Sequence, residues 1–110
     1  MKLIDRIKKN KGITLNVHTN RTKKTGFAVS LTGFETKAHT LNERVLNTYL
    51  ETNKVILSKQ NHFFGAWIEN DLTYFDVSII VRSKKQAISL GRQNKQLAIF
   101  DLKKLQTIYI

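Results

Sequence analysis

The second half of the chain contains a pattern that fixes one part of the fold. Residues 62–68 and 72–81 are rich in aromatic and β-branched side chains, and Glu69, Asn70 and Asp71 separate the two runs. Short groups of Asn and Asp between such runs favour a tight turn, so the pattern is typical of a β-hairpin. A chain with this hairpin inside it is expected to build a mostly antiparallel sheet.

Two segments show apolar residues at helical spacing. Thr40 with Glu43 fits a capping box, in which the Thr hydroxyl accepts a backbone amide and the Glu side chain returns to the cap residue. The helix that begins there is predicted to run to about Ser58. Ser83 with Gln86 fits a second capping box, ahead of a shorter helix.

The rest of the chain supplies a third helical pattern and four short strands. Residues 1–10 have an amphipathic pattern that ends near Gly12, as a short helix would. The basic run 21–26 is predicted to be a hairpin tip between the first two strands. The strands expected from alternation of apolar and polar residues cover residues 13–17, 27–31, 96–102 and 107–110.

Together these elements predict an α+β fold in one small domain, residues 1–110. The expected order is ββα, then ββα, then one or two strands, with a mostly antiparallel sheet and two packed helices. Residues 1–25 are a basic N-terminal segment with the first strand, and residues 26–110 are the remainder of the domain.

Composition excludes several classes of protein. The chain has no cysteine, which excludes disulfides, thiolate metal sites and cysteine nucleophiles. Its apolar runs fall short of the roughly 20 residues of a membrane span, and its first residues lack the apolar core of a signal peptide. We therefore expect a cytoplasmic protein with no membrane partner.

Positive charge is concentrated in two blocks. The chain has 19 basic and 8 acidic residues, a formal net charge of +11. Residues 1–24 hold eight bases and one acid, residues 77–100 hold five bases and no acid, and the remainder is nearly neutral. Such blocks attract nucleic acid, because neutralised phosphates release condensed counterions, although excess lysine can also serve solubility alone. The predicted nucleic-acid-binding residues are Lys8, Lys9, Lys11, Arg21, Lys23, Lys24, Arg82, Lys84, Lys85, Arg92 and Lys95.

Aromatic residues gather on the predicted hairpin. Alternation along a strand places Phe63, Gly65 and Trp67 on one face and Phe64 on the other, so at most half of these rings are exposed. Exposed rings beside basic side chains stack the bases of single strands, whereas the same rings can simply fill a core. For a protein partner, Trp67 and Phe64 are the predicted contact residues.

Two carboxylates on predicted strands are the candidates for catalysis. Asp76 and Asp101 each follow an aromatic residue, and a pair of carboxylates can hold Mg²⁺ for phosphodiester cleavage. The alternative is structural, because a buried carboxylate must be satisfied by amides or a cation. His18 and His62 would form an acid–base pair only if the fold joined them. We expect no catalytic residues, no metal and no cofactor.

The C-terminal part of the chain contains three further characteristic runs, residues 62–78, 86–91 and 94–102. With them the chain resembles, over about residues 26–110, small uncharacterised proteins of bacteriophages and other mobile elements. The family pattern is an aromatic–Gly–Gly–Trp hairpin, a Leu-Asp-Val-Ser strand and a closing Gln-x-Ala-Ile-Phe/Tyr-Asp-Leu strand. Ala66 replaces the second glycine of the hairpin and Phe75 replaces the leucine. The family has no established activity, so the resemblance implies a setting and no catalytic residue.

These observations favour a binding protein over an enzyme. The setting and the charge lead us to expect that it engages nucleic acid or a host nucleoprotein, including a host defence nuclease blocked in the manner of an anti-CRISPR protein. The alternative is a protein–protein inhibitor that uses the Trp67 hairpin or an open sheet edge. A metal-dependent nuclease ranks third. A C-terminal edge strand ending at Ile110 would also allow a homodimer.

Overall fold

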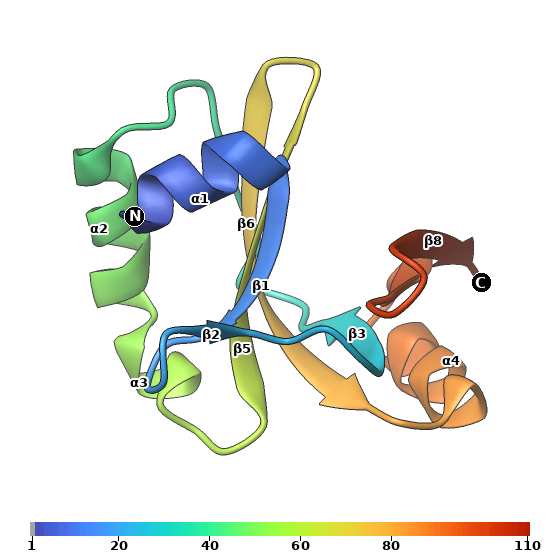
Figure 1. Cartoon of the computed structure of the whole chain (residues 1–110). Coiled ribbons are helices and arrows are strands. Elements are labelled where there is room, and N and C mark those ends of the chain that lie inside the picture. Colours follow the sequence, from blue (N-terminus) through green and yellow to red (C-terminus); the bar gives the residue numbers. More distant parts are fainter. Residues whose placement is uncertain (1) are drawn as a thin grey trace.

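The β-hairpin of residues 62–81 forms the centre of one sheet (Figure 1). The computed structural model describes residues 2–110, which form four helices and eight strands. In chain order they are α1 Leu3–Asn10, β1 Gly12–Asn16, β2 Arg21–Thr22, β3 Phe27–Ser30, β4 Thr36–Ala38, α2 Glu43–Thr52, α3 Lys54–Leu57, β5 His62–Glu69, β6 Leu72–Val81, α4 Lys84–Gln93, β7 Ala98–Asp101 and β8 Gln106–Tyr109.

The strand order in the sheet is β2-β1-β5-β6-β3-β7-β8, and β4 also pairs with β6. The strand pairs are antiparallel throughout. The expected α+β class with a mostly antiparallel sheet is therefore confirmed. The expected order of elements and the count of two packed helices are not, because α1 precedes the first strand and α3 follows α2. In addition β2 and β4 are extra strands, and β2 lies at the start of the run 21–26 that was expected to be a turn.

The hairpin β5–β6 has a two-residue turn. Glu69 pairs with Leu72, and Asn70 and Asp71 have φ angles of 52° and 64°. Positive φ at both central residues is the signature of a type I′ turn, whose twist matches the twist of paired strands. This turn sets the register of the entire hairpin, because every pair follows from Glu69 and Leu72.

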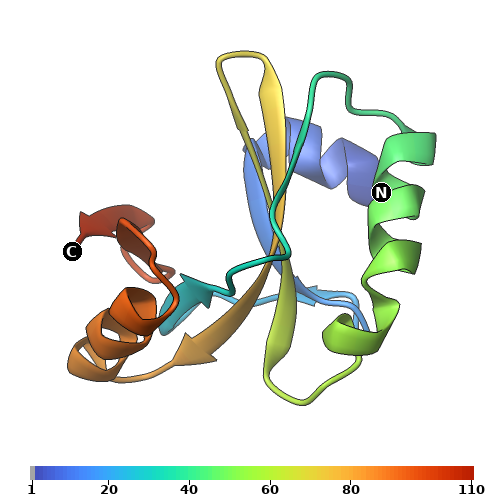
Figure 2. The ribbon, with the colours of Figure 1, turned by 180° about the vertical axis from the view of Figure 1, so that it is seen from behind.

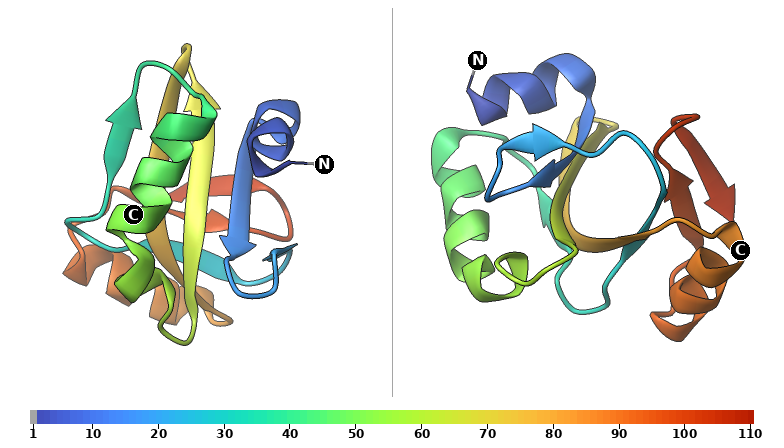
Figure 3. Two further views of the ribbon diagram at one scale, coloured as in Figure 1. Left: turned by 90° about the vertical axis from the view of Figure 1, so that its left-hand side faces the viewer. Right: turned by 60° about the horizontal axis from the view of Figure 1, so that its bottom comes forward.

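The first two strands do not form the expected hairpin. β1 pairs with β2 and β5, whereas β3 pairs with β6 and β7, so two strands separate β1 from β3. Residues 23–26 carry the chain from one arm of the sheet to the other (Figure 3). Alternation predicted the half-buried strand β1, whose burial alternates, whereas β3 buries the adjacent residues Ala28 and Val29. Alternation does not predict the partner of a strand, and β1 and β3 pair with opposite edges of the central hairpin.

The helix boundaries show which polar residues act as caps. The side chain of Asn42 accepts a hydrogen bond from Val45 N at 2.9 Å, so Asn42, and not Thr40, caps α2. The predicted helix to Ser58 is interrupted at Asn53, after which α3 follows. Ser83 Oγ accepts from the backbone N–H of Gln86 at 3.2 Å, which confirms the predicted start of α4.

The N-terminal helix is confirmed from Leu3 to Asn10, while Met1 lies outside the described residues. It ends at Lys11, which has a left-handed φ of 58° and donates its backbone N–H to Ile7 O. No helix within residues 2–110 is long and apolar enough to cross a membrane.

Helices α1, α2 and α3 cover one face of the central strands (Figures 1 and 2). Phe64, Phe75 and Tyr49 form the middle of this core, with ring centroids 5.1 to 5.8 Å apart. Leu46 and Val77 are also buried there. At its other end the sheet curls, and α4 packs on β3 and β7 around a separate buried cluster of Val29, Ala87 and Ile99.

Candidate binding cavity

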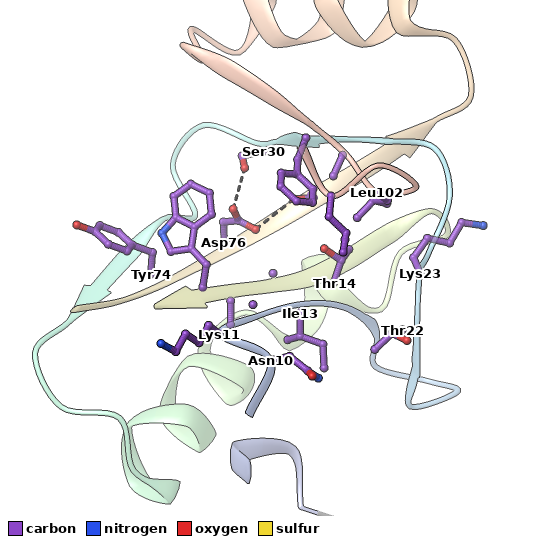
Figure 4. Close-up of a pocket in the computed structure, with 18 of the residues that line it drawn as sticks. Asn10, Lys11, Ile13, Thr14, Thr22, Lys23, Ser30, Tyr74, Asp76 and Leu102 are labelled. Atoms are coloured by element: carbon purple, nitrogen blue, oxygen red, sulfur yellow. Dashed lines mark hydrogen bonds between the residues drawn. The ribbon is translucent and has the colours of Figure 1, made fainter. Parts of the chain in front are cut away.

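A cavity of about 680 Å³ opens on the face of β1, β5 and β6 that is turned away from α2 and α3 (Figure 4). The C-terminal arm of the sheet forms its far wall through Phe100, Leu102 and Leu105. A small cluster of Ala28, Phe63, Ile80 and Leu102, with Phe100 packed against it, holds the two arms of the sheet together there. The volume lies in the range of sites that hold a ligand of nucleotide size.

The floor of the cavity is a glycine opposite a carboxylate. Gly65 of β5 pairs with Asp76 of β6, and a Cβ atom at Gly65 would overlap the Asp76 carboxylate. The carboxylate therefore occupies the space that a side chain at residue 65 would fill. Only glycine permits this arrangement without a shift of Asp76.

Two serine hydroxyls hold the Asp76 carboxylate in place. Ser30 Oγ donates to Oδ2 at 2.8 Å and Ser78 Oγ donates to Oδ1 at 3.1 Å (Figure 4). Burial raises the pKa of Asp76, the two serine hydrogen bonds act in the opposite direction, and the charge of Glu35 adds to the increase. A carboxyl group with a pKa shifted by burial inside a cavity is a mark of a functional site.

The register of β3 on β6 brings Ser30 to this position. Ser30 pairs with Ser78, so it is a diagonal neighbour of Asp76. β4 pairs with the beginning of β6 from Phe75, and residues 32–35 leave the edge of β6 between β3 and β4, as the path of the chain in Figure 2 shows. The hydroxyl of Tyr49 donates to Phe34 O at 2.7 Å and fixes this loop, and burial raises the pKa of Tyr49, which keeps the hydroxyl protonated.

Four cations surround the mouth of the cavity: Arg6 of α1, Lys11 after it, and Lys23 and Lys24 after β2. The guanidinium of Arg6 donates to Asn20 Oδ1 at 3.1 Å, which ties α1 to the turn between β1 and β2. Within residues 2–110 the one salt bridge joins Lys54 and Glu51, so these four cations are not neutralised by acidic side chains.

An aromatic pair borders the same cavity. Trp67 and Tyr74 are cross-strand partners, with centroids 5.7 Å apart and ring planes at 71°. Trp67 is 47% exposed, although tryptophan is usually well buried. An exposed ring next to unneutralised cations provides a stacking surface for a planar ligand with phosphates.

The structure divides the predicted nucleic-acid-binding residues into groups. Lys11, Lys23 and Lys24 line the cavity. Three others are exposed on α1 and β2 without lining it: Lys8, Lys9 and Arg21. The residues of the second block lie on or beside α4, at the other end of the molecule from α1 and outside the cavity lining (Figure 1): Arg82, Lys84, Lys85, Arg92 and Lys95.

The structure corrects the predicted role of Phe64 and shows which of the two predicted roles Asp101 has. Phe64 is 0% exposed in the helix-covered core, so it offers no side-chain surface to a protein partner. Asp101 lies in β7, separated from β6 by β3, and its Oδ1 accepts the backbone N–H groups of Lys103 and Lys104 at 3.0 and 3.1 Å. Asp101 thus stabilises the turn between β7 and β8. This is the structural role predicted as the alternative to metal binding.

The groups considered for catalysis are engaged in other contacts. Across residues 2–110 there is no group of three or more His, Asp or Glu side chains placed to hold a metal ion. The ring of His18 contacts Ser58 O at 3.2 Å, and the ring of His62 contacts Gln60 O at 2.8 Å, so each imidazole is engaged with a different backbone carbonyl.

Sequence reasoning missed Arg6, Ser30 and Ser78 as parts of one site. The sequence does contain a signal for the Gly65–Asp76 pair at the cavity floor. A two-residue turn at Asn70 and Asp71 fixes the hairpin register, and this register places Gly65 opposite Asp76. The contribution of Ser30 depends on the distant pairing of β3 with β6, which no local pattern reveals.

No family model, curated protein or solved structure matches this chain in the three comparisons made.

Proposed function

We propose that the protein is a binding protein whose cavity face binds single-stranded nucleic acid, free or as part of a nucleoprotein. The observation that carries this proposal is the convergence of Arg6, Lys11, Lys23 and Lys24 on a cavity that also exposes Trp67. Cations contact phosphates in any sequence, and an exposed ring stacks on any base.

Single strands fit this face better than a duplex. The aromatic pair lies in the wall of a concave site, and bases stacked inside a duplex cannot reach it, whereas bases of a single strand can be splayed out. The cavity volume of about 680 Å³ fits one nucleotide rather than a helix segment.

The mode of action that follows from this chemistry is occlusion. A protein seated on the exposed strand of a host nucleoprotein would cover the nucleic acid without changing it covalently. An inhibitor of a host defence nuclease is one such role.

A salt titration tests the proposal. Binding of labelled ten-nucleotide DNA and RNA strands is followed by fluorescence anisotropy between 50 and 200 mM salt. Four phosphate contacts to a single strand give a slope of about −2.8 in log K against log salt, or a loss of about 50-fold in affinity over this range.

A matched pair of variants locates the surface. Lys11, Lys23 and Lys24 are changed together to Gln, and the control changes Lys84, Lys85 and Lys95 to Gln, with the same loss of charge. We expect the first variant to bind weakly with a shallow salt slope, and the control to keep the affinity of the unchanged protein. Equal losses in both would contradict a site at the cavity, and no binding at 50 mM salt would favour the rival proposal of a protein partner.

A further inference from the structure

The floor of the cavity carries a recognition group that the phosphate and stacking contacts do not use. We propose that Asp76 binds the Watson–Crick edge of one extruded base and that this base is guanine. This inference rests on the proposed function, because it names the base selected by the same site. It is argued from the register of three strands, the hydrogen bonds of the carboxylate and the position of the aromatic pair.

Strands β1, β5 and β6 form the floor of the cavity, with a polar side chain on each of the two outer strands. Thr14 of β1, Gly65 of β5 and Asp76 of β6 are successive partners across the sheet, and all three line the cavity. Neighbouring strands are about 4.8 Å apart, so the Cα atoms of Thr14 and Asp76 are about 10 Å apart. The Asp76 carboxylate leans over Gly65, in the space that a Cβ atom there would occupy. A flat ring that enters the cavity on the Thr14 side of the carboxylate can therefore direct its polar edge at Asp76.

Asp76 is prepared to accept two parallel hydrogen bonds. Each of its carboxylate oxygens already accepts one serine hydroxyl, from Ser30 and from Ser78. A carboxylate oxygen has two acceptor positions, so one position on each oxygen is left for a ligand. The two serines also prevent rotation of the group, which fixes the direction of the remaining positions.

Guanine is the base that matches this acceptor pair. Its Watson–Crick edge presents the N1–H and N2–H₂ donors side by side, and a carboxylate accepts both at once. Adenine and cytosine place an acceptor nitrogen beside their amino group, and uracil and thymine flank one N–H with two carbonyl oxygens. In each of those bases a lone pair would face the buried carboxylate, which is unfavourable.

The aromatic pair lies at the right distance to stack the same nucleotide or its neighbour. Trp67 is two residues from Gly65 on β5, and Tyr74 is two residues from Asp76 on β6, on the same face. Two residues along a strand span about 7 Å. A strand that stacks a base on Trp67 therefore brings the adjoining base to the Asp76 carboxylate.

The position of Asp76 is explained by a ligand better than by folding. Burial disfavours its charge, and no basic side chain forms a salt bridge with it within residues 2–110. Its two protein partners are neutral hydroxyls, which compensate a buried charge less well than a cation does. A ligand with two N–H donors supplies the partners that the fold does not.

The test is a set of strands that differ in one base. Ten-nucleotide strands of thymidine carry guanine, hypoxanthine, adenine or cytosine at one central position, and their affinities for the full chain are measured at 100 mM salt. We expect guanine to bind at least fivefold more tightly than adenine or cytosine, the effect of one bidentate contact. Hypoxanthine, which lacks the N2 amino group, is expected between them.

Variants assign the preference to one residue. Asp76→Asn keeps the shape of the side chain but offers one acceptor and one donor, and it is expected to lose the guanine preference. Asp101→Asn is the control, and it is expected to keep the preference because Asp101 serves the turn after β7. A cooperative thermal unfolding transition of Asp76→Asn, followed by circular dichroism, shows that the variant is folded, so a lost preference is assigned to the side chain.

Each outcome decides between the two proposals. Equal affinity for all four strands would overturn the guanine assignment and leave the proposed function intact. A guanine preference that survives Asp76→Asn would overturn the role of Asp76. Failure to bind any strand at 50 mM salt would overturn both proposals.

Discussion

The two faces of the hairpin β5–β6 are built from alternate residues of the same strands and have opposite characters. On the helix-covered face, Phe64 pairs with Val77 and Ala66 pairs with Phe75, and all four are buried. On the open face, Gly65 pairs with Asp76, whose carboxylate lies over the glycine at the floor of the cavity. One face is filled with apolar side chains, and the other carries a carboxylate beneath a cavity.

The comparison shows how one strand serves both purposes. Successive side chains of a strand point to opposite faces of the sheet, so residues that pack in the core alternate with residues that line the cavity. The helix-covered face carries the free energy of folding through large apolar side chains. The open face is free to hold groups that reduce stability.

Substitution of Phe64 should have the largest effect. Phe64→Ala removes a fully buried ring that contacts Tyr49 and Phe75, and we expect a loss of about 3–5 kcal/mol in the free energy of unfolding. Urea denaturation measures this loss. Trp67→Ala on the open face is the matched control, with an expected loss of about 1 kcal/mol. Similar losses for both would contradict the division between the faces.

Gly65→Ala should have the next largest effect. The new methyl group overlaps the Asp76 carboxylate, and overpacking of this kind lowers stability by about 1–3 kcal/mol. In the double variant Gly65→Ala with Asp76→Ala, the space is vacated and much of the loss should be recovered. A double-mutant cycle measures this coupling, and strict additivity would show that the two residues do not share the cavity floor.

Asp76→Asn should have a smaller effect that depends on pH. Because burial raises the pKa of Asp76, the native state binds the proton more tightly than the unfolded state does. Stability contributed by this group is then greatest at low pH and falls as pH rises through the native pKa. The side chain of the Asn variant does not titrate, so the variant does not lose stability in this way as pH rises. The melting temperature of the variant minus that of the unchanged protein should therefore increase with pH. A difference that is constant from pH 4 to pH 8 would contradict the burial of the charge.

Lys23→Gln should have the smallest effect on folding. The side chain of Lys23 is exposed, so we expect a change in stability of about 0.5 kcal/mol or less. The salt slope for single-stranded DNA should decrease by about 0.7, the contribution of one phosphate. Lys84→Gln on α4 provides the control, and an equal decrease there would place the phosphate contacts outside the cavity.

The sequence predicted the local elements well and their partners poorly. The hairpin at Asn70 and Asp71 and the cap at Ser83 were identified because their signals lie within a few residues. The cap of α2 was assigned to Thr40 instead of Asn42, since both residue types accept backbone amides and the pattern cannot rank them. The pairing of β1 and β3 was wrong, because strand partners are chosen by the whole sheet.

The site was predicted only in part for the same reason. Lys11, Lys23 and Lys24, which line the cavity, are predicted as binding residues because clusters of charge can be read directly from the sequence. Asp76 was singled out from its apolar neighbours, but as a possible metal ligand with Asp101, and the fold places Asp101 in a turn. The cavity itself depends on the curl of the sheet, and no short sequence pattern predicts that curl.

The central claim is that ligand binds on the open face of the sheet, and the single tryptophan tests it most directly. Trp67 is the one tryptophan of the chain and lies on the rim of the cavity, so its fluorescence reports on this site alone. Titration with a ten-nucleotide strand should quench the emission and saturate at the dissociation constant found by anisotropy. Binding by anisotropy with no change in Trp67 emission would contradict the account, because the strand would then lie elsewhere on the molecule.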